Sequence, residues 1–143
     1  MKLLNYCKLS IQSSTANEAF ARSTVAAFCA SLNPTLEQIN DIKTAVSEAV
    51  NNCVIHGYAG GSGEIYIEVA LFDSEVSIQI QDPGCGIPNV NEAMQPFFTG
   101  KPQEERSGMG FTLMQAFMDE VDVVSTLGQG TTVVMRKRLD SHA

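Results

Sequence analysis

The sequence predicts an α+β fold, a two-layer sandwich in which helices cover one face of a mixed, mostly antiparallel sheet. Three observations predict it: the segments run strand, helix, helix, two strands, loop, helix, two strands; the strands come as hairpins; and the helical segments are apolar on one side. The 143 residues, of which 44% are hydrophobic, can bury one core, so we expect a single domain over residues 1–143.

The N-terminal part is expected to hold one strand and two helices. Residues 6–12 alternate between apolar and polar, as a half-buried strand does. A helix follows a capping box at residues 15–18, with apolar residues at steps of three and four. The next helix is expected to start at Asn33-Pro34, with proline in its first turn, and to continue to Ile55.

The C-terminal part is expected to hold two hairpins, separated by a long loop and a short helix. The loop, residues 82–110, contains five of the eleven glycines and four of the five prolines. Loops of this length in a compact domain are usually functional or disordered. The expected strands and helix span residues 65–71, 76–80, 111–118, 121–125 and 131–138.

Charge and cysteine content narrow the function classes. Nine Lys and Arg against sixteen Asp and Glu give a net charge of −7, which argues against direct nucleic-acid binding. The four cysteines are widely spaced without a histidine cluster, so neither a metal site nor a disulfide framework is indicated. No apolar stretch suits a signal peptide or a membrane span, so we expect a cytoplasmic protein.

Two polar residues stand out on the second helix. Glu48 and Asn52 are four residues apart and fall together on the side opposite the apolar arc. Asparagine in a helix interior lowers helix propensity, which favours a role beyond folding. A glutamate on a helix is nevertheless most often a solvated charge, so this pair alone is a weak signal.

Two glycine-containing segments flank the long loop. Asp82 ends an alternating strand and is followed by Gly84 and Gly86, which let a flat ring approach the backbone, while the carboxylate can accept a hydrogen bond from an exocyclic amine. An ordinary Asp-Pro-Gly turn fits the same residues. Gly108 and Gly110 lead into a helix N-terminus, where backbone N–H groups favour a phosphate, but they lack the P-loop pattern.

Together, Glu48-x-x-x-Asn52, Asp82-x-Gly84-x-Gly86 and Gly108-x-Gly110 resemble, in order and spacing, the N, G1 and G2 boxes of the GHKL ATPase superfamily, whose fold is the Bergerat sandwich. Within it the chain is similar, over nearly its whole length, to the anti-sigma-factor kinases of sporulation. The stretches that carry this narrower resemblance are residues 20–22, 42–50, 55–58, 104–111 and 130–133.

The resemblance implies a serine/threonine-protein kinase that uses ATP and Mg²⁺, yields ADP and also acts as an anti-sigma factor. Asn52 would ligate Mg²⁺, Asp82 would read the adenine amine, and Glu48 would be the general base for a serine hydroxyl. Further nucleotide contacts would come from Gly84, Gly86, Thr99, Lys101, Arg106, Ser107, Gly108, Gly110 and Thr131.

The implied partners are a sporulation sigma factor of the F type and an anti-anti-sigma factor, whose serine is phosphorylated. Arg22 would contact both partners, and the chain would form a homodimer. The chain departs from the family at Gly100, where a second threonine usually precedes the lysine, so the loop loses a hydroxyl.

Three alternatives stay open. A paralogous kinase of a stress-response sigma factor would share every ATP-site residue. A histidine kinase catalytic domain would need a phosphoacceptor histidine upstream, and neither His56 nor His142 fits that role. A non-catalytic module with a degenerate nucleotide site is disfavoured, because all three boxes keep their polar residues and glycines.

Overall fold

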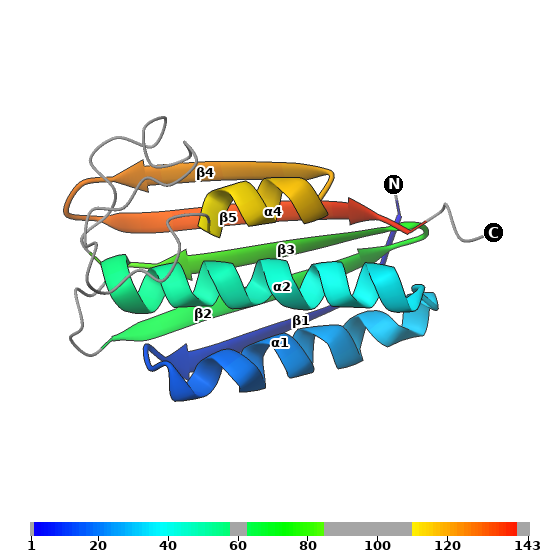
Figure 1. The fold of residues 1–143 in the computed structure, drawn as a ribbon, viewed down its shortest axis with the longest axis horizontal. Helices are drawn as coiled ribbons and strands as arrows, with labels where there is room; N and C mark the ends of the chain where they lie inside the picture. Colours follow the sequence, from blue (N-terminus) through cyan, green and yellow to red (C-terminus); the bar gives the residue numbers. More distant parts are fainter. Residues whose placement is uncertain (1, 58–62, 85–109, 140–143) are drawn as a thin grey trace.

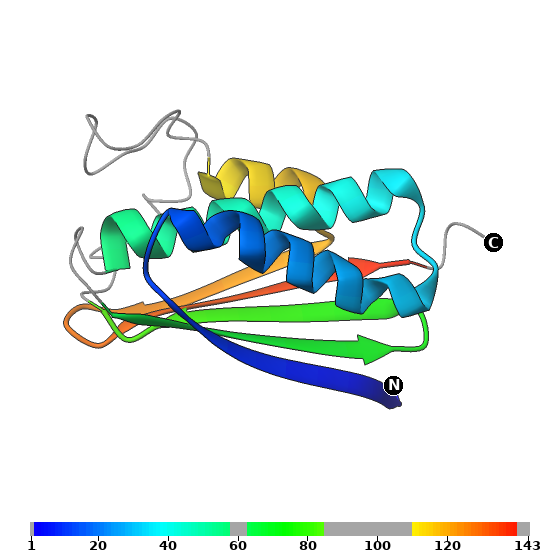
Figure 2. The ribbon, with the colours of Figure 1, turned by 90° about the horizontal axis from the view of Figure 1, so that it is seen from below.

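The computed structural model describes residues 2–57, 63–84 and 110–139. Its strands form one five-stranded sheet in the order β1-β2-β3-β5-β4, and every neighbouring pair is antiparallel. Figure 2 shows the helices on one face of this sheet. The predicted two-layer α+β sandwich is therefore confirmed, with a described sheet that is antiparallel throughout rather than mixed.

The elements follow the predicted order. The strands are β1 Leu3–Gln12, β2 Glu64–Phe72, β3 Glu75–Asp82, β4 Glu120–Thr126 and β5 Gly130–Arg138. The helices are α1 Ala16–Cys29, the 3₁₀ turn η1 Ala30–Leu32, α2 Leu36–Asn52, the π-helical turn η2 Cys53–Gly57 and α4 Gly110–Phe117. None of the helices in the described part of the chain is long and apolar enough to cross a membrane.

The core lies between the sheet and the helices. Alternate residues of β2 and β3 point toward the helices and are buried, so the period of two seen in the sequence is the period of burial. The buried arc of α2, with Ile42, Val46, Ala49 and Val50, packs between α1 and α4 and completes the core.

The start of α2 corrects one prediction. The helix begins at Leu36 rather than at Asn33-Pro34, because Thr35 is extended and forms the N-cap. The Thr35 Oγ1 accepts from the Gln38 N–H at 3.1 Å, and the Gln38 side chain accepts from the Thr35 N–H at 2.8 Å. These reciprocal bonds are a capping box.

The capping box predicted for α1 is wrong. Thr15 precedes the helix with φ −60° and ψ −27°, already helical, and its side chain makes no capping hydrogen bond. An N-cap side chain needs an extended backbone to reach the N–H groups of the first turn. The helix entry is held instead by Asn17, whose side-chain amide donates to the Gln12 carbonyl oxygen at 2.9 Å.

Candidate functional site

Residues from α2, β3, β5 and α4 meet at one end of the sandwich. Figure 1 shows the C-terminal end of α2, the N-terminal end of α4 and the end of β3 on the same side of the molecule. Helix α2 packs against α4, and the turn η2 contacts both β3 and β5. Residues that are far apart in the sequence are therefore collected where these elements end.

Asn52 faces the beginning of α4. A Cβ atom built on Gly110 would lie 3.1 Å from the Asn52 Nδ2 and 3.2 Å from its Oδ1, tighter than ordinary contact. Glycine at position 110 thus lets the helix start against the Asn52 amide. The predicted N-box asparagine and the last glycine of the predicted G2 box are neighbours in space.

Glu48 lies one turn before Asn52 on α2 and is half-buried. Arg22 on α1 reaches toward the same part of α2, with its Nη1 3.5 Å from the Ser47 Oγ and 3.7 Å from the Glu18 Oε1. Its side chain stays 41% exposed. The predicted partner-binding arginine therefore touches the residue directly before the predicted general base.

Asp82 ends β3 and is almost fully buried, with 2% of its surface exposed. Its Oδ1 accepts a hydrogen bond from the Gly84 N–H at 3.1 Å. Burial raises the pKa of Asp82, and hydrogen bonding by the Cys53 side chain and the Gly84 N–H lowers it only in part. Among the described residues, its hydrogen-bond partners include no cation.

Thr131 lies directly across from Asp82 in the pairing of β3 with β5 and is buried. Its hydroxyl is 2.8 Å from the Ser125 Oγ on β4, and the Ser125 hydroxyl also lies 3.1 Å from the Gly130 carbonyl oxygen. The register of β3 and β5 therefore brings together Asp82 and Thr131, the two residues predicted to lie beside adenine. Neither Ser125 nor Cys53 carried a motif that could have singled it out.

Gly130 makes this close pairing possible. Its φ of +107° disfavours any side chain, and a Cβ there would collide with the Asp82 carbonyl oxygen and the Pro83 Cα. Only glycine allows β5 to begin this close to the end of β3. A glycine directly before a strand was the available sequence signal for this requirement.

Part of the predicted nucleotide site lies within the described residues. Gly84 is described and half-buried, directly beside Asp82. Six other predicted contacts lie outside the described residues, namely Gly86, Thr99, Lys101, Arg106, Ser107 and Gly108.

Among residues 2–57, 63–84 and 110–139, no cluster of three or more His, Cys, Asp and Glu could hold a metal. Mg²⁺ suits the site nevertheless, because it prefers oxygen ligands and commonly takes one side chain together with substrate phosphates and water. The amide oxygen of Asn52 fits that requirement.

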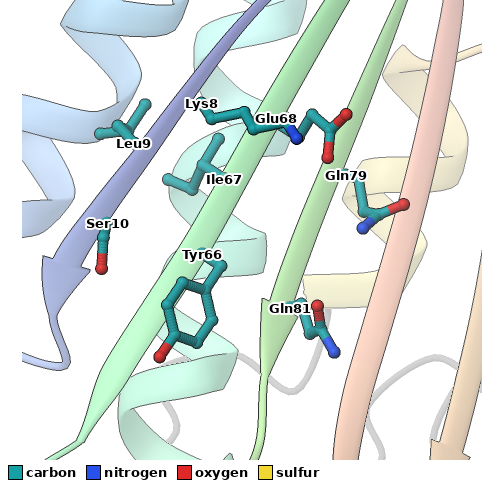
Figure 3. A pocket seen from close by; sticks show the side chains of 8 residues that line it. All are labelled: Lys8, Leu9, Ser10, Tyr66, Ile67, Glu68, Gln79 and Gln81. Carbon is teal, nitrogen blue, oxygen red and sulfur yellow. The ribbon is translucent and has the colours of Figure 1, made fainter.

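A hollow lies on the outer face of the sheet, away from the helices. Figure 3 shows Tyr66 of β2 between Ser10 of β1 and Gln81 of β3, its two cross-strand partners, at this hollow. The Tyr66 hydroxyl donates to the Glu64 Oε2 at 2.8 Å. These side chains form the polar outer face of the sheet and belong to a different surface from the cluster around Asn52 and Asp82.

The fold and the site define a nucleotide-binding ATPase domain. Residues 11–137 match the histidine kinase-like ATPase domain family. The same fold occurs in a crystal structure of the RsbU and RsbW domains of a Mycobacterium tuberculosis protein, with a TM-score of 0.68 over 95% of this chain and 32% of that one, at 22% identity.

Curated relatives narrow the class. The chain is 52% identical over 141 residues to the anti-sigma F factor of Thermoanaerobacter sp. (strain X514), covering 99% of both chains. It is 52% identical to the anti-sigma F factor of Bacillus thuringiensis (strain Al Hakam), covering 96% of this chain and 94% of the relative. The chain belongs to the anti-sigma F factor family.

Proposed function

We propose that this protein is an anti-sigma factor of the F type and an ATP-dependent serine/threonine-protein kinase. It binds a sporulation sigma factor and phosphorylates a serine of an anti-anti-sigma factor. The observation that carries the proposal is the convergence of Asn52 on Gly110, beside a buried Asp82 that pairs with Thr131. Residues 1–143 act as one domain in the cytoplasm, where free thiols such as those of Cys7, Cys29 and Cys53 persist.

The base of ATP is recognised at the end of β3. The Asp82 carboxylate accepts a hydrogen bond from the adenine amine, with Thr131 beside it on β5. Gly84, together with Gly86, leaves room for the flat ring. A buried carboxylate that has no cation among its described partners is suited to this role, because the amine of a bound base can donate a hydrogen bond to it.

The phosphates lie where α4 begins. The backbone N–H groups around Gly108 and Gly110 donate hydrogen bonds to the phosphate oxygens at the helix N-terminus. Mg²⁺, held through the Asn52 oxygen, would neutralise phosphate charge during transfer. The resemblance places the remaining polar contacts on the segment before α4, at Thr99, Lys101, Arg106 and Ser107.

Glu48 acts on the acceptor serine. The serine hydroxyl gives its proton to the Glu48 carboxylate while its oxygen bonds to the γ-phosphorus. The bond between that phosphorus and the β–γ bridging oxygen breaks, and ADP leaves. Glu48 suits this role because it lies one helical turn from Asn52, the residue that positions the metal.

Both protein partners approach over the α1–α2 surface around Arg22. The guanidinium is partly exposed and lies against Ser47, so a partner held there is close to Glu48. Arginine pairs well with carboxylates at interface centres. The homodimer forms on a different surface, for which the exposed edge strand β1 is suited, because Leu3, Leu4 and Tyr6 are about half exposed there.

The test uses Arg22→Ala in two assays on one preparation. We expect the variant to bind ATP normally, yet to lose affinity for the sigma factor and to transfer less labelled γ-phosphate to the anti-anti-sigma serine, by about ten-fold or more in each assay. The control variant is Lys43→Ala, which removes a half-buried basic side chain of α2. Wild-type protein that transfers no phosphate would contradict the kinase proposal, and unchanged binding of both partners would contradict the shared surface.

A further inference from the structure

Three polar side chains lie in one row across β3, β5 and β4, which are neighbouring strands of the sheet (Figure 1). Asp82 is paired with Thr131, and Thr131 is paired on its other side with Ser125. Residues directly opposite one another in an antiparallel sheet point to the same face, with Cβ atoms about 4.5–5.5 Å apart. The row therefore runs from the buried carboxyl of Asp82 to a half-buried serine on the edge strand β4.

The hydrogen bonds of Ser125 have a direction. Its hydroxyl donates to the Gly130 carbonyl oxygen at 3.1 Å, because a carbonyl oxygen can only accept. A serine hydroxyl has one hydrogen, so in the 2.8 Å bond between Ser125 Oγ and Thr131 Oγ1 the donor is Thr131. The chain of bonds thus runs from Thr131 to Ser125 and from Ser125 to the Gly130 carbonyl oxygen.

This direction decides what Thr131 can offer to a ligand. Its single hydrogen is given to Ser125, so its oxygen has only acceptor positions left. The carboxylate of Asp82, its neighbour on β3, is also a pure acceptor and takes the Gly84 N–H at Oδ1. Two neighbouring acceptors suit a group with two hydrogens to donate, such as an exocyclic amine, and disfavour a carbonyl oxygen in the same place.

We propose that Ser125 is a positioning residue that fixes the polarity of the Thr131 hydroxyl and so makes the site select a 6-aminopurine over a 6-oxopurine nucleotide. The inference rests on the proposed function, in which Asp82 and Thr131 lie beside adenine. It adds a residue of β4 that acts through Thr131 rather than on the base. The turn from β4 to β5 takes part as well, because the Gly130 carbonyl oxygen is the final acceptor of the chain.

The test compares ATP with inosine triphosphate, which carries an oxygen where ATP carries the 6-amino group. Both are titrated into the full-length chain by calorimetry, and the readout is the ratio of the two dissociation constants. Ser125→Ala removes the acceptor of the Thr131 hydrogen, which can then turn toward Asp82 or toward a base oxygen. We expect this variant to bind ATP about two- to ten-fold more weakly and to bind inosine triphosphate no more weakly than wild type.

Two further variants separate the hydroxyl of Ser125 from its place in the hairpin. Ser125→Thr keeps the hydroxyl and should keep the wild-type ratio. The matched control is Thr126→Ala, which removes an exposed hydroxyl from the next residue of β4 and should also keep that ratio.

Thr131→Val asks the same question from the other end of the bond, because it removes the hydroxyl whose polarity Ser125 fixes. It should lower the preference for ATP at least as far as Ser125→Ala does, and the double variant should show no further fall. A wild-type preference in Thr131→Val would overturn the inference, even if Ser125→Ala failed to fold.

The outcomes separate this inference from the proposed function. If wild-type protein binds both nucleotides equally, the amine is not read at the end of β3, and both proposals fail. If wild-type protein prefers ATP and Ser125→Ala keeps that preference, only the role of Ser125 fails. An equal loss of affinity for both nucleotides in Ser125→Ala would make Ser125 a residue that supports the hairpin, and would also overturn the inference. A preference that falls in Ser125→Ala and returns in Ser125→Thr supports it.

Discussion

A buried charged side chain lies near each end of α2, and only one of the two is paired with an opposite charge. Near its N-terminal end, Lys137 of β5 reaches the Asp41 carboxylate at 3.2 Å and donates to the Phe117 carbonyl oxygen at 2.6 Å. Near its C-terminal end, the carboxyl of Asp82 on β3 accepts the Gly84 N–H, and its hydrogen-bond partners among the described residues include no cation. The first charge is neutralised by the fold, and the second is not.

This difference distinguishes the two ends of α2. The end near Lys137 stabilises the fold and is called the stabilising end, and the end near Asp82 holds the candidate site and is called the functional end. Burying a charge is costly unless it is paired, so a paired group can serve the fold, while an unpaired one raises the energy of the folded state. The raised pKa of Asp82 expresses that cost. The cost persists where a ligand can offset it, which is why the site residues gather around Asp82 rather than around Lys137.

The largest expected effect is on catalysis at the functional end. Glu48→Gln should slow phosphate transfer to the anti-anti-sigma serine by about 10²–10⁴-fold, because the amide cannot take the hydroxyl proton. Affinity for ATP and the free energy of unfolding should change little. The matched control is Glu37→Gln, an exposed acidic residue in the first turn of the same helix, which should transfer at the wild-type rate. Equal losses in both variants would remove the functional distinction between the two ends.

The next effect is on stability at the other end. Lys137→Met keeps the length of the side chain but leaves Asp41 and the Phe117 carbonyl oxygen without the ammonium group. Removing one partner of a buried pair is strongly destabilising, and since these side chains are 11% and 20% exposed we expect a loss of about 2–3 kcal/mol. Urea unfolding measures the loss, and ATP affinity of the folded protein should not change.

Asp82→Asn is the counterpart and should be neutral or stabilising at neutral pH in urea unfolding. A carboxyl whose pKa is raised by folding adds most stability below its unfolded pKa and loses that contribution as pH rises through its folded pKa. The variant has no carboxyl to ionise. Its free energy of unfolding, relative to that of wild type, should therefore rise as pH increases from the unfolded to the folded pKa of Asp82. A variant that is less stable than wild type, by as much as Lys137→Met, would show that both buried charges serve the fold.

The sequence predicted the elements well because their pattern is local. The alternation in β2 and β3 and the three-four spacing in α2 report burial directly, and the spacing of Glu48 and Asn52 placed both on one helix side. Contacts between distant strands and helices carry no such pattern. The approach of Asn52 to Gly110, for example, depends on how α2 packs against α4, which no short stretch of sequence encodes.

The smallest expected effect tests what the sequence could not decide about helix ends. Thr15…Glu18 and Thr35…Gln38 have the same capping-box spacing, but only Thr35 has an extended backbone and makes both capping bonds. Thr35→Ala should therefore cost about 1 kcal/mol of unfolding free energy, since the Gln38 N–H in the first turn of α2 loses its Thr35 Oγ1 acceptor. Thr15→Ala, which breaks no capping bond, should stay within about 0.5 kcal/mol of wild type. Urea unfolding of both variants and wild type, with ATP affinity measured in parallel, checks the pair. Equal losses would mean that Thr15 also caps its helix in solution, and a loss of ATP affinity in Thr35→Ala would mean that the two ends of α2 are not independent.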